Sequence, residues 1–206
     1  MNIKPIKKEK STKREIIELG IIIGIFAFIF LTGLQTEVAG FLQRAVLQTG
    51  IHNSHDEIPN DEQDNADYNF KLIGLDGSYL ELEDLKGKVI FMNFWATWCP
   101  PCIAEIPNIQ ELYDNTRNEN IVFLMVSTDK NEAKIRKFIE KKGYTIPIYR
   151  PASVRPEVFS SNSIPTTFVI SPEGKIAYKN IGIANYNTDS FKELLGNLNN
   201  KYQGAL

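Results

Sequence analysis

The 206-residue chain has only two cysteines and two histidines, and basic residues are not in excess. Two cysteines are too few for a disulfide-stapled scaffold, and too few to form a structural zinc site alone. A formal net charge of −2 argues against nucleic acid as a main partner. Internal repeats and a glycine-rich phosphate-binding loop are also missing. With 43% hydrophobic residues, most of the chain is expected to fold around a globular core.

Charge is nearly absent from one long stretch near the N-terminus. From Ile16 to Leu34 the sequence is apolar over nineteen residues, interrupted by the charge of Glu18 alone. A helix of that length measures about 28 Å, close to the thickness of a bilayer's hydrocarbon core. Residues 1–15 are basic, so the positive-inside rule puts them in the cytoplasm and the rest of the chain outside it. We therefore predict a cytoplasmic segment over residues 1–15 and a transmembrane anchor over residues 16–36.

A cleaved signal peptide is the alternative to a retained anchor. The apolar run is long for a signal peptide, and no A-x-A cleavage pattern follows it. Residues 37–66 are predicted to be a linker, with an amphipathic start and a polar, acidic second half. His52 and His55 in this linker have the spacing of two metal ligands, but their polar surroundings favour solvated histidines.

Residues 67–206 alternate between strand and helix patterns. The predicted strands, in chain order, are Asn69–Ile73, Tyr79–Leu82, Val89–Phe94, Ile121–Val126, Thr145–Tyr149, Thr166–Ile170 and Lys175–Ile181. The predicted helices run from Pro100 or Pro101 to Asn115, over Glu132–Lys142 and over Thr188–Asn200, with short helical segments at Leu82–Leu85 and Val154–Ser160. Helices between continuous apolar strands indicate parallel crossovers, and the last two strands indicate an antiparallel edge. This predicts one α/β domain with a mixed central sheet and helices on both faces.

The chemistry is expected at the C-x-x-C sequence of Cys99 and Cys102, which follows a buried strand and opens a helix. Cys99 falls at or near the N-cap, and Pro101 near the first helical position. Unpaired N–H groups and the helix dipole favour a thiolate there, so Cys99 is predicted to be the exposed nucleophile with a lowered pKa. Cys102, one turn further, is predicted to be the resolving thiol. A bond closing so short a loop would add little stability, which favours a redox-active pair over a structural one.

The segment Phe94–Cys102 (FWATWCPPC) resembles the active site of the thioredoxin superfamily. Pro107 stands where that family has a helix-kinking proline, Ile164-Pro165-Thr166 resembles its cis-proline loop, and Ser171–Gly174 resembles its last hairpin turn. The resemblance covers about residues 67–206 and implies a thioredoxin-like fold. It also implies that Trp98, Pro100, Ile164, Pro165 and Thr166 contact the substrate.

Within the superfamily, the sequence is similar to the TlpA/ResA-like group of membrane-tethered thiol–disulfide oxidoreductases. Asn93 stands where thioredoxin has a buried aspartate, Glu105 follows Cys102 by three residues, and an extra segment lies around residues 131–149. The Pro-Pro dipeptide departs from well-known members, which leaves the redox potential open. Glu105 either exchanges protons with Cys102 or is a solvated acid near the helix dipole. Trp95 and Trp98 are expected mainly to pack around the site.

The resemblance implies dithiol–disulfide exchange with exported proteins, apocytochrome c among them, and recharging by a membrane thiol electron donor. No cofactor other than the Cys99–Cys102 disulfide, and no metal, is expected. Three other functions compete with this one: an oxidant or isomerase on the same fold, a metal-binding module, and a peroxidase. The absence of histidine from residues 67–206 argues against the metal-binding module. A tryptophan-flanked C-x-x-C argues against the single peroxidatic cysteine of a peroxidase.

Overall fold

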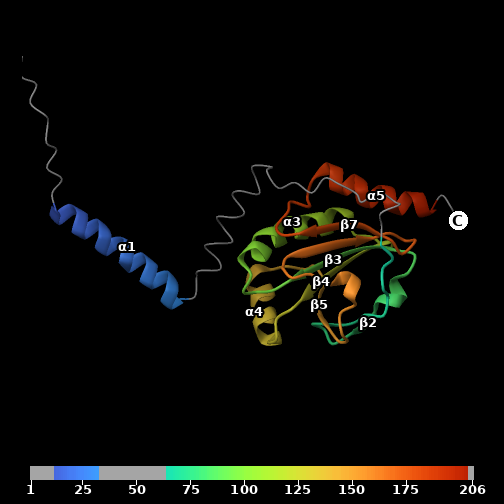
Figure 1. The fold of residues 1–206 in the computed structure, drawn as a ribbon, viewed down its shortest axis with the longest axis horizontal. Helices are drawn as coiled ribbons and strands as arrows, with labels where there is room; N and C mark the ends of the chain where they lie inside the picture. Colours follow the sequence, from blue (N-terminus) through green and yellow to red (C-terminus); the bar gives the residue numbers. More distant parts are fainter. Residues whose placement is uncertain (1–11, 33–63, 204–206) are drawn as a thin grey trace, which may run out of the picture.

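The computed structural model describes residues 12–32 and 64–203 (Figure 1). Helix α1 spans Thr12–Thr32. Its Arg14–Thr32 stretch has a mean hydropathy of 2.3 and is long and apolar enough to cross a membrane. Most of the predicted linker, with His52 and His55, and the ends of the chain at 1–11 and 204–206 lie outside the described residues. The last residues of the linker, 64–66, already pair with the domain: Asn65 bridges Lys175, and Ala66 N–H donates to the Gly174 carbonyl at 2.8 Å.

A seven-stranded sheet forms the centre of the domain, with the order β2-β1-β5-β4-β3-β6-β7. Its strands are β1 (Lys71–Gly74), β2 (Tyr79–Glu81), β3 (Val89–Trp95), β4 (Ile121–Ser127), β5 (Ile148–Pro151), β6 (Thr166–Ile170) and β7 (Ile176–Ile181). The helices are η1 (Leu82–Leu85), α3 (Pro100–Thr116), α4 (Glu132–Lys142), η2 (Glu157–Phe159) and α5 (Asp189–Gln203).

The pairing confirms the predicted mixed sheet. Strand β4 runs parallel to both β3 and β5, as expected for strands joined by the crossover helices α3 and α4. Strands β6 and β7 form an antiparallel hairpin at one edge. At the other edge β1 pairs antiparallel with both β2 and β5, and Lys71 N–H donates to Ser153 Oγ at 2.9 Å just beyond that pairing.

The two faces of the sheet have different covers because side chains alternate along each strand. Phe91 and Trp95 of β3 belong to the cluster that receives the buried side chains of α3, α4 and α5. Ile90 and Phe94 belong to the opposite cluster, where η1 and η2 supply the helical residues. All seven residues of β3 are buried, so this strand is held in the middle of the domain and its C-terminal end is a rigid base for the loop that leads into α3.

Many predicted boundaries shift by one to three residues, and two elements differ in ways that the structure explains. The strand predicted at Thr145–Tyr149 begins only at Ile148, because the N–H groups of Thr145 and Ile146 donate to Gln110 Oε1 rather than to a neighbouring strand, each at 3.0 Å. The helix predicted at Val154–Ser160 is a three-residue 3₁₀ turn, η2. Pro156 precedes that turn and disfavours a helical conformation at the residue before it.

Candidate active site

The pair of cysteines forms a disulfide at the start of α3, directly beyond the end of β3. Cys99 has the extended backbone of an N-cap, and its Sγ accepts the N–H of Cys102 at 3.3 Å. Pro100 is therefore the first helical residue and Pro101 the second, one position later than predicted for Pro101. The N-cap contact shows how an anionic sulfur at Cys99 would be stabilised, since the helix N-terminus points an N–H group at it.

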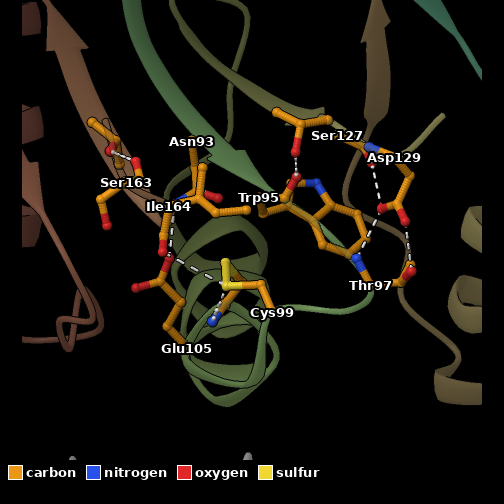
Figure 2. Close-up of a disulfide and its surroundings, with 12 residues drawn as sticks. Asn93, Trp95, Thr97, Cys99, Glu105, Ser127, Asp129, Ser163 and Ile164 are labelled. Carbon is orange, nitrogen blue, oxygen red and sulfur yellow. Dashed lines mark hydrogen bonds between the residues drawn. A yellow bond between two sulfur atoms is a disulfide. The ribbon is translucent and has the colours of Figure 1, made fainter. Parts of the chain in front are cut away.

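The exposure of the two cysteines corrects one part of the prediction. Cys99 was expected to be exposed, yet only 4% of it is accessible, and Cys102 is fully buried. With the disulfide formed, Cys99 Sγ lies 3.7 Å from the carbonyl oxygen of Ile164, so the neighbouring loop covers it closely (Figure 2). The most accessible neighbour is Trp98, which is 60% exposed.

The loop before β6 brings the predicted proline to the disulfide. The Ile164–Pro165 peptide bond is cis, as the resemblance implied. The loop is fixed from both sides: Gly182 N–H donates to the Pro165 carbonyl at 2.8 Å, and Thr166 Oγ1 donates to the Ser163 carbonyl at 2.7 Å. Thr166 is fully buried with its hydroxyl already occupied, so its predicted contact with a substrate, which stays a prediction, would use its backbone. Among the predicted contact residues, Trp98 is exposed and Pro100 and Ile164 are half-buried.

Of the two alternatives that the sequence left open for Glu105, the structure excludes the solvated acid. It is fully buried, and its two carboxyl oxygens have different partners. Oε1 accepts from Asn93 Nδ2 at 2.8 Å, and Oε2 accepts from the N–H of Ala184 at 3.2 Å. Burial raises the pKa of the Glu105 carboxyl to about 8, although the two hydrogen bonds oppose that shift. At neutral pH this carboxyl is therefore mainly protonated. It lies three residues after Cys102 on the same helix, a spacing that makes two side chains neighbours.

Further buried polar residues near the disulfide form a chain of hydrogen bonds with Glu105. Asn93 also donates from Nδ2 to Thr167 Oγ1 at 2.8 Å. Thr167 in turn hydrogen-bonds the hydroxyl of Tyr186, which also accepts from Asn180 Nδ2 at 3.2 Å. Burial and the nearby Glu105 raise the pKa of Tyr186 well above its ordinary value, so this phenol stays protonated. The buried chain of contacts runs from α3 across β3 and β6 to the segment after β7.

Sequence reasoning missed a second polar cluster, on the other side of Cys99. Asp129 accepts from Thr97 N–H at 2.8 Å, from Thr97 Oγ1 at 2.7 Å and from Ser127 Oγ at 2.9 Å (Figure 2). These bonds tie the residues just before the C-x-x-C to the end of β4. An aspartate that follows a buried strand was the only signal for it in the sequence.

Trp95 packs as predicted. Its ring is fully buried against Phe138 of α4, with centroids 5.6 Å apart. Its indole N–H has no hydrogen-bond partner among the described residues. Within residues 12–32 and 64–203, no three His, Cys, Asp or Glu side chains gather in a way that could hold a metal ion.

The fold and this site together define a thioredoxin-like protein with a C-x-x-C disulfide at a helix N-terminus. The AhpC/TSA family matches residues 64–179, more than half of the chain, and the chain belongs to that family. A solved structure with a similar fold is the exposed lipoprotein thioredoxin Etrx1 of Streptococcus pneumoniae. It has a TM-score of 0.53 and 28% identity, and the match covers 62% of this chain and 98% of that one.

Several similar curated proteins carry the name thiol-disulfide oxidoreductase ResA, in agreement with the resemblance seen in the sequence. The protein from Bacillus cereus is 34% identical over 115 residues, which are 55% of this chain and 66% of that protein. The protein from Halalkalibacterium halodurans is 30% identical over 129 residues, which are 62% of this chain and 73% of that protein. The chain thus spans slightly under two thirds of the Bacillus cereus relative.

Proposed function

We propose that this protein is a thiol–disulfide oxidoreductase that exchanges its Cys99–Cys102 pair with disulfides of other proteins. The observation that carries the proposal is the position of the bond. Cys99 Sγ accepts an N–H at the start of α3 and lies 3.7 Å from the Ile164 carbonyl beside the cis-proline. A sulfur held there is stabilised as a thiolate and is next to a backbone edge that can receive an extended peptide.

The exchange proceeds in two displacements. In the reduced protein, the Cys99 thiolate attacks one sulfur of a substrate disulfide, forms a mixed disulfide and releases the other substrate sulfur as a thiolate. The Cys102 thiolate then attacks Cys99 Sγ, which closes the Cys99–Cys102 bond and releases the second substrate sulfur. Two electrons pass from the pair to the substrate, and the two substrate thiolates take up protons.

Glu105 supplies a proton route for Cys102 in this scheme. In the oxidised protein its carboxyl is mainly protonated at neutral pH, since its pKa is about 8. When an electron donor reduces the disulfide, Cys102 leaves as a thiolate, takes the Glu105 proton and leaves a carboxylate behind. That carboxylate removes the proton again when Cys102 must attack the mixed disulfide. The cycle returns Glu105 to its starting form.

We place this activity outside the cytoplasm, on a protein held by α1 as a single-pass anchor. The apolar character of α1 and the basic residues before it support this arrangement. A membrane thiol carrier is the proposed electron donor, and exported proteins with disulfides are the proposed substrates. Apocytochrome c is the particular substrate that the TlpA/ResA resemblance suggests.

The reduction potential distinguishes a reductant from an oxidant or isomerase. We expect a value near that of thioredoxin, about −270 mV, rather than the value of about −120 mV of a strong oxidant. Equilibration of the full-length protein with glutathione or dithiothreitol buffers, followed by quantification of free thiols, measures it. A value near −120 mV would instead assign the protein to the introduction of disulfides.

Cys102→Ala is expected to capture the substrates. Cys102 resolves the mixed disulfide from one helical turn away, so its removal leaves release to slower external thiols. Expressed with its anchor in the native host, the variant should give adducts that migrate more slowly on non-reducing gels, and mass spectrometry would identify them. The Cys99→Ala, Cys102→Ala double variant is the control.

The adduct set decides between the substrate classes. Cytochrome c precursors would support the maturation role, whereas many unrelated exported proteins would favour general reduction or isomerisation. Adducts that persist unchanged in the double variant would show that the cysteine pair is not the exchange site.

A further inference from the structure

In the side-chain amide of Asn93, the nitrogen makes hydrogen bonds and the oxygen makes none among the described residues. Asn93 is fully buried in β3, and its Nδ2 donates to both Glu105 Oε1 and Thr167 Oγ1, each at 2.8 Å. Its Oδ1 is buried and has no hydrogen-bond partner among the described residues. A buried acceptor without a partner destabilises the folded state, because it has lost water and gained nothing in return. The amide therefore points both its donors at the cluster and leaves its acceptor unused.

The two oxygens of the Glu105 carboxyl differ in how well each can carry the proton. Oε2 faces the N–H of Ala184, a backbone donor that cannot become an acceptor. A proton on Oε1, the oxygen that faces Asn93, leaves the bond to Ala184 intact, whereas a proton on Oε2 would weaken that bond, because a hydroxyl oxygen is a poorer acceptor than a carbonyl oxygen. A carboxylate at Oε1 requires a donor from Asn93, whereas a protonated Oε1 requires an acceptor. The observed orientation of the amide suits the carboxylate, and a neutral carboxyl would fit it only with the proton on Oε2, at the expense of the bond to Ala184 N–H.

Rotation of the amide by about 180° exchanges Nδ2 and Oδ1 with almost no change of shape. In the rotated form Oδ1 accepts from the protonated Oε1 of Glu105. Oδ1 also accepts from Thr167, because a hydroxyl can turn from acceptor to donor. Each protonation state of Glu105 thus has one amide orientation that suits it, and the position that Oδ1 would take on rotation, now held by Nδ2, is 2.8 Å from both partners.

We propose that Asn93 is a positioning residue for the exchange reaction, and that its amide turns over each time the Glu105 carboxyl gains or loses its proton. Both forms of the carboxyl then keep a hydrogen bond in a site without solvent. Because this role requires Glu105 to exchange a proton with Cys102, it rests on the proposed function.

Among the groups around Asn93, Glu105 is the one whose change of protonation would rotate the amide. Tyr186 faces Glu105 from the segment after β7 and keeps its proton, since its pKa is raised well above the ordinary value. Tyr178 of β7 is a further phenol near Tyr186. Cys99 and Cys102, at the start of α3, do not titrate while they are bonded to each other. Asn93 and Thr167, from β3 and β6, carry no ionisable group.

The experiment follows both residues in the oxidised, full-length protein in detergent micelles by NMR. Carbon-13 in glutamate reports the Glu105 carboxyl, and nitrogen-15 in asparagine reports the Asn93 amide, each assigned by its loss in Glu105→Gln or Asn93→Leu. Between pH 5 and 10 we expect the two signals to shift with the same midpoint. In Glu105→Gln the Asn93 signal should no longer change with pH.

Asn93→Leu provides a second readout, because it keeps the number and branching of the side-chain heavy atoms and removes both the donor and the acceptor. The Glu105 titration should move to higher pH by about one unit, a tenfold change in proton affinity, since the carboxylate loses a charge-assisted hydrogen bond that is stronger than the neutral bond lost by the protonated form. The pH profile of insulin reduction should move by the same amount, which a merely structural role would not cause.

Two results would overturn the role of Asn93. One is a Glu105 signal that titrates while the wild-type Asn93 signal stays constant, and the other is a Glu105 signal that does not titrate over this range. Neither result depends on catalysis. An inactive protein in which both signals shift together would instead reject the proposed function and leave the coupled amide in place.

Discussion

Cys99→Ser is expected to lower the rate of insulin disulfide reduction by a factor on the order of 10³ or more, to the rate of dithiothreitol alone. The attacking group must be a thiolate, and the serine hydroxyl is not ionised at neutral pH. The position otherwise stays intact, because a serine oxygen can accept the Cys102 N–H as an N-cap. The assay is insulin turbidity with the full-length protein in detergent.

Cys102→Ser is the matched control for this experiment. It keeps the nucleophile and should still form a mixed disulfide, but without rapid resolution. The two variants can be separated by mass spectrometry after a single encounter with a disulfide reagent, when Cys102→Ser carries an adduct and Cys99→Ser does not. An adduct on Cys99→Ser alone would reverse the assignment of the nucleophile and the resolving thiol.

The buried carboxyl of Glu105 should make the oxidised protein less stable as the pH rises. Its pKa is raised from an ordinary 4.5 to about 8 in the folded protein. Between these values the folded state holds a proton that the unfolded state has lost, so the free energy of unfolding falls with increasing pH. Below pH 4.5 the carboxyl is protonated in both states and the free energy of unfolding does not change with pH through this group. Above pH 8 the decrease in the free energy of unfolding is complete. At 1.36 kcal/mol per unit the total is at most about 5 kcal/mol.

Glu105→Gln should remove this dependence. We expect the variant to gain stability relative to the wild type progressively between pH 5 and 8.5, measured by urea unfolding with the disulfide intact. Glu119→Gln, which removes an exposed carboxyl, is the control and should follow the wild type across the range. A constant difference between Glu105→Gln and the wild type would show that Glu105 does not hold its proton through folding.

Local patterns predicted those parts of the fold that local forces decide. The continuous apolar runs of β3 and β4 predicted buried parallel strands, and Gly143 predicted the end of α4, where it has a positive φ of 69°. The predicted start of β5 was wrong because a side chain distant in the sequence binds the backbone there in place of a neighbouring strand. Gln110 binds the backbone of Thr145 and Ile146, from 35 and 36 positions away, and no local pattern contains that contact.

The same limit applies to the site. The C-x-x-C spacing and the helix start after β3 were visible in the sequence, so both cysteines could be placed. Whether Glu105 is solvated could not be decided, because it depends on Ala184, 79 positions away, folding over it. Thr167, 74 positions from Asn93, was not singled out for the same reason. A pair of polar residues so far apart in the chain has no periodicity to reveal it.

The pairing of β1 with β5 sets an order of events during synthesis. The β1–β2 hairpin is made before the rest of the domain, yet Lys71 bonds to Ser153, which is added to the chain 82 residues later. A two-stranded hairpin is only marginally stable in water on its own. The first part of the domain to be made thus waits for a neighbouring strand that is added much later. On a ribosome that adds about 5–20 residues per second, this delay lasts several seconds.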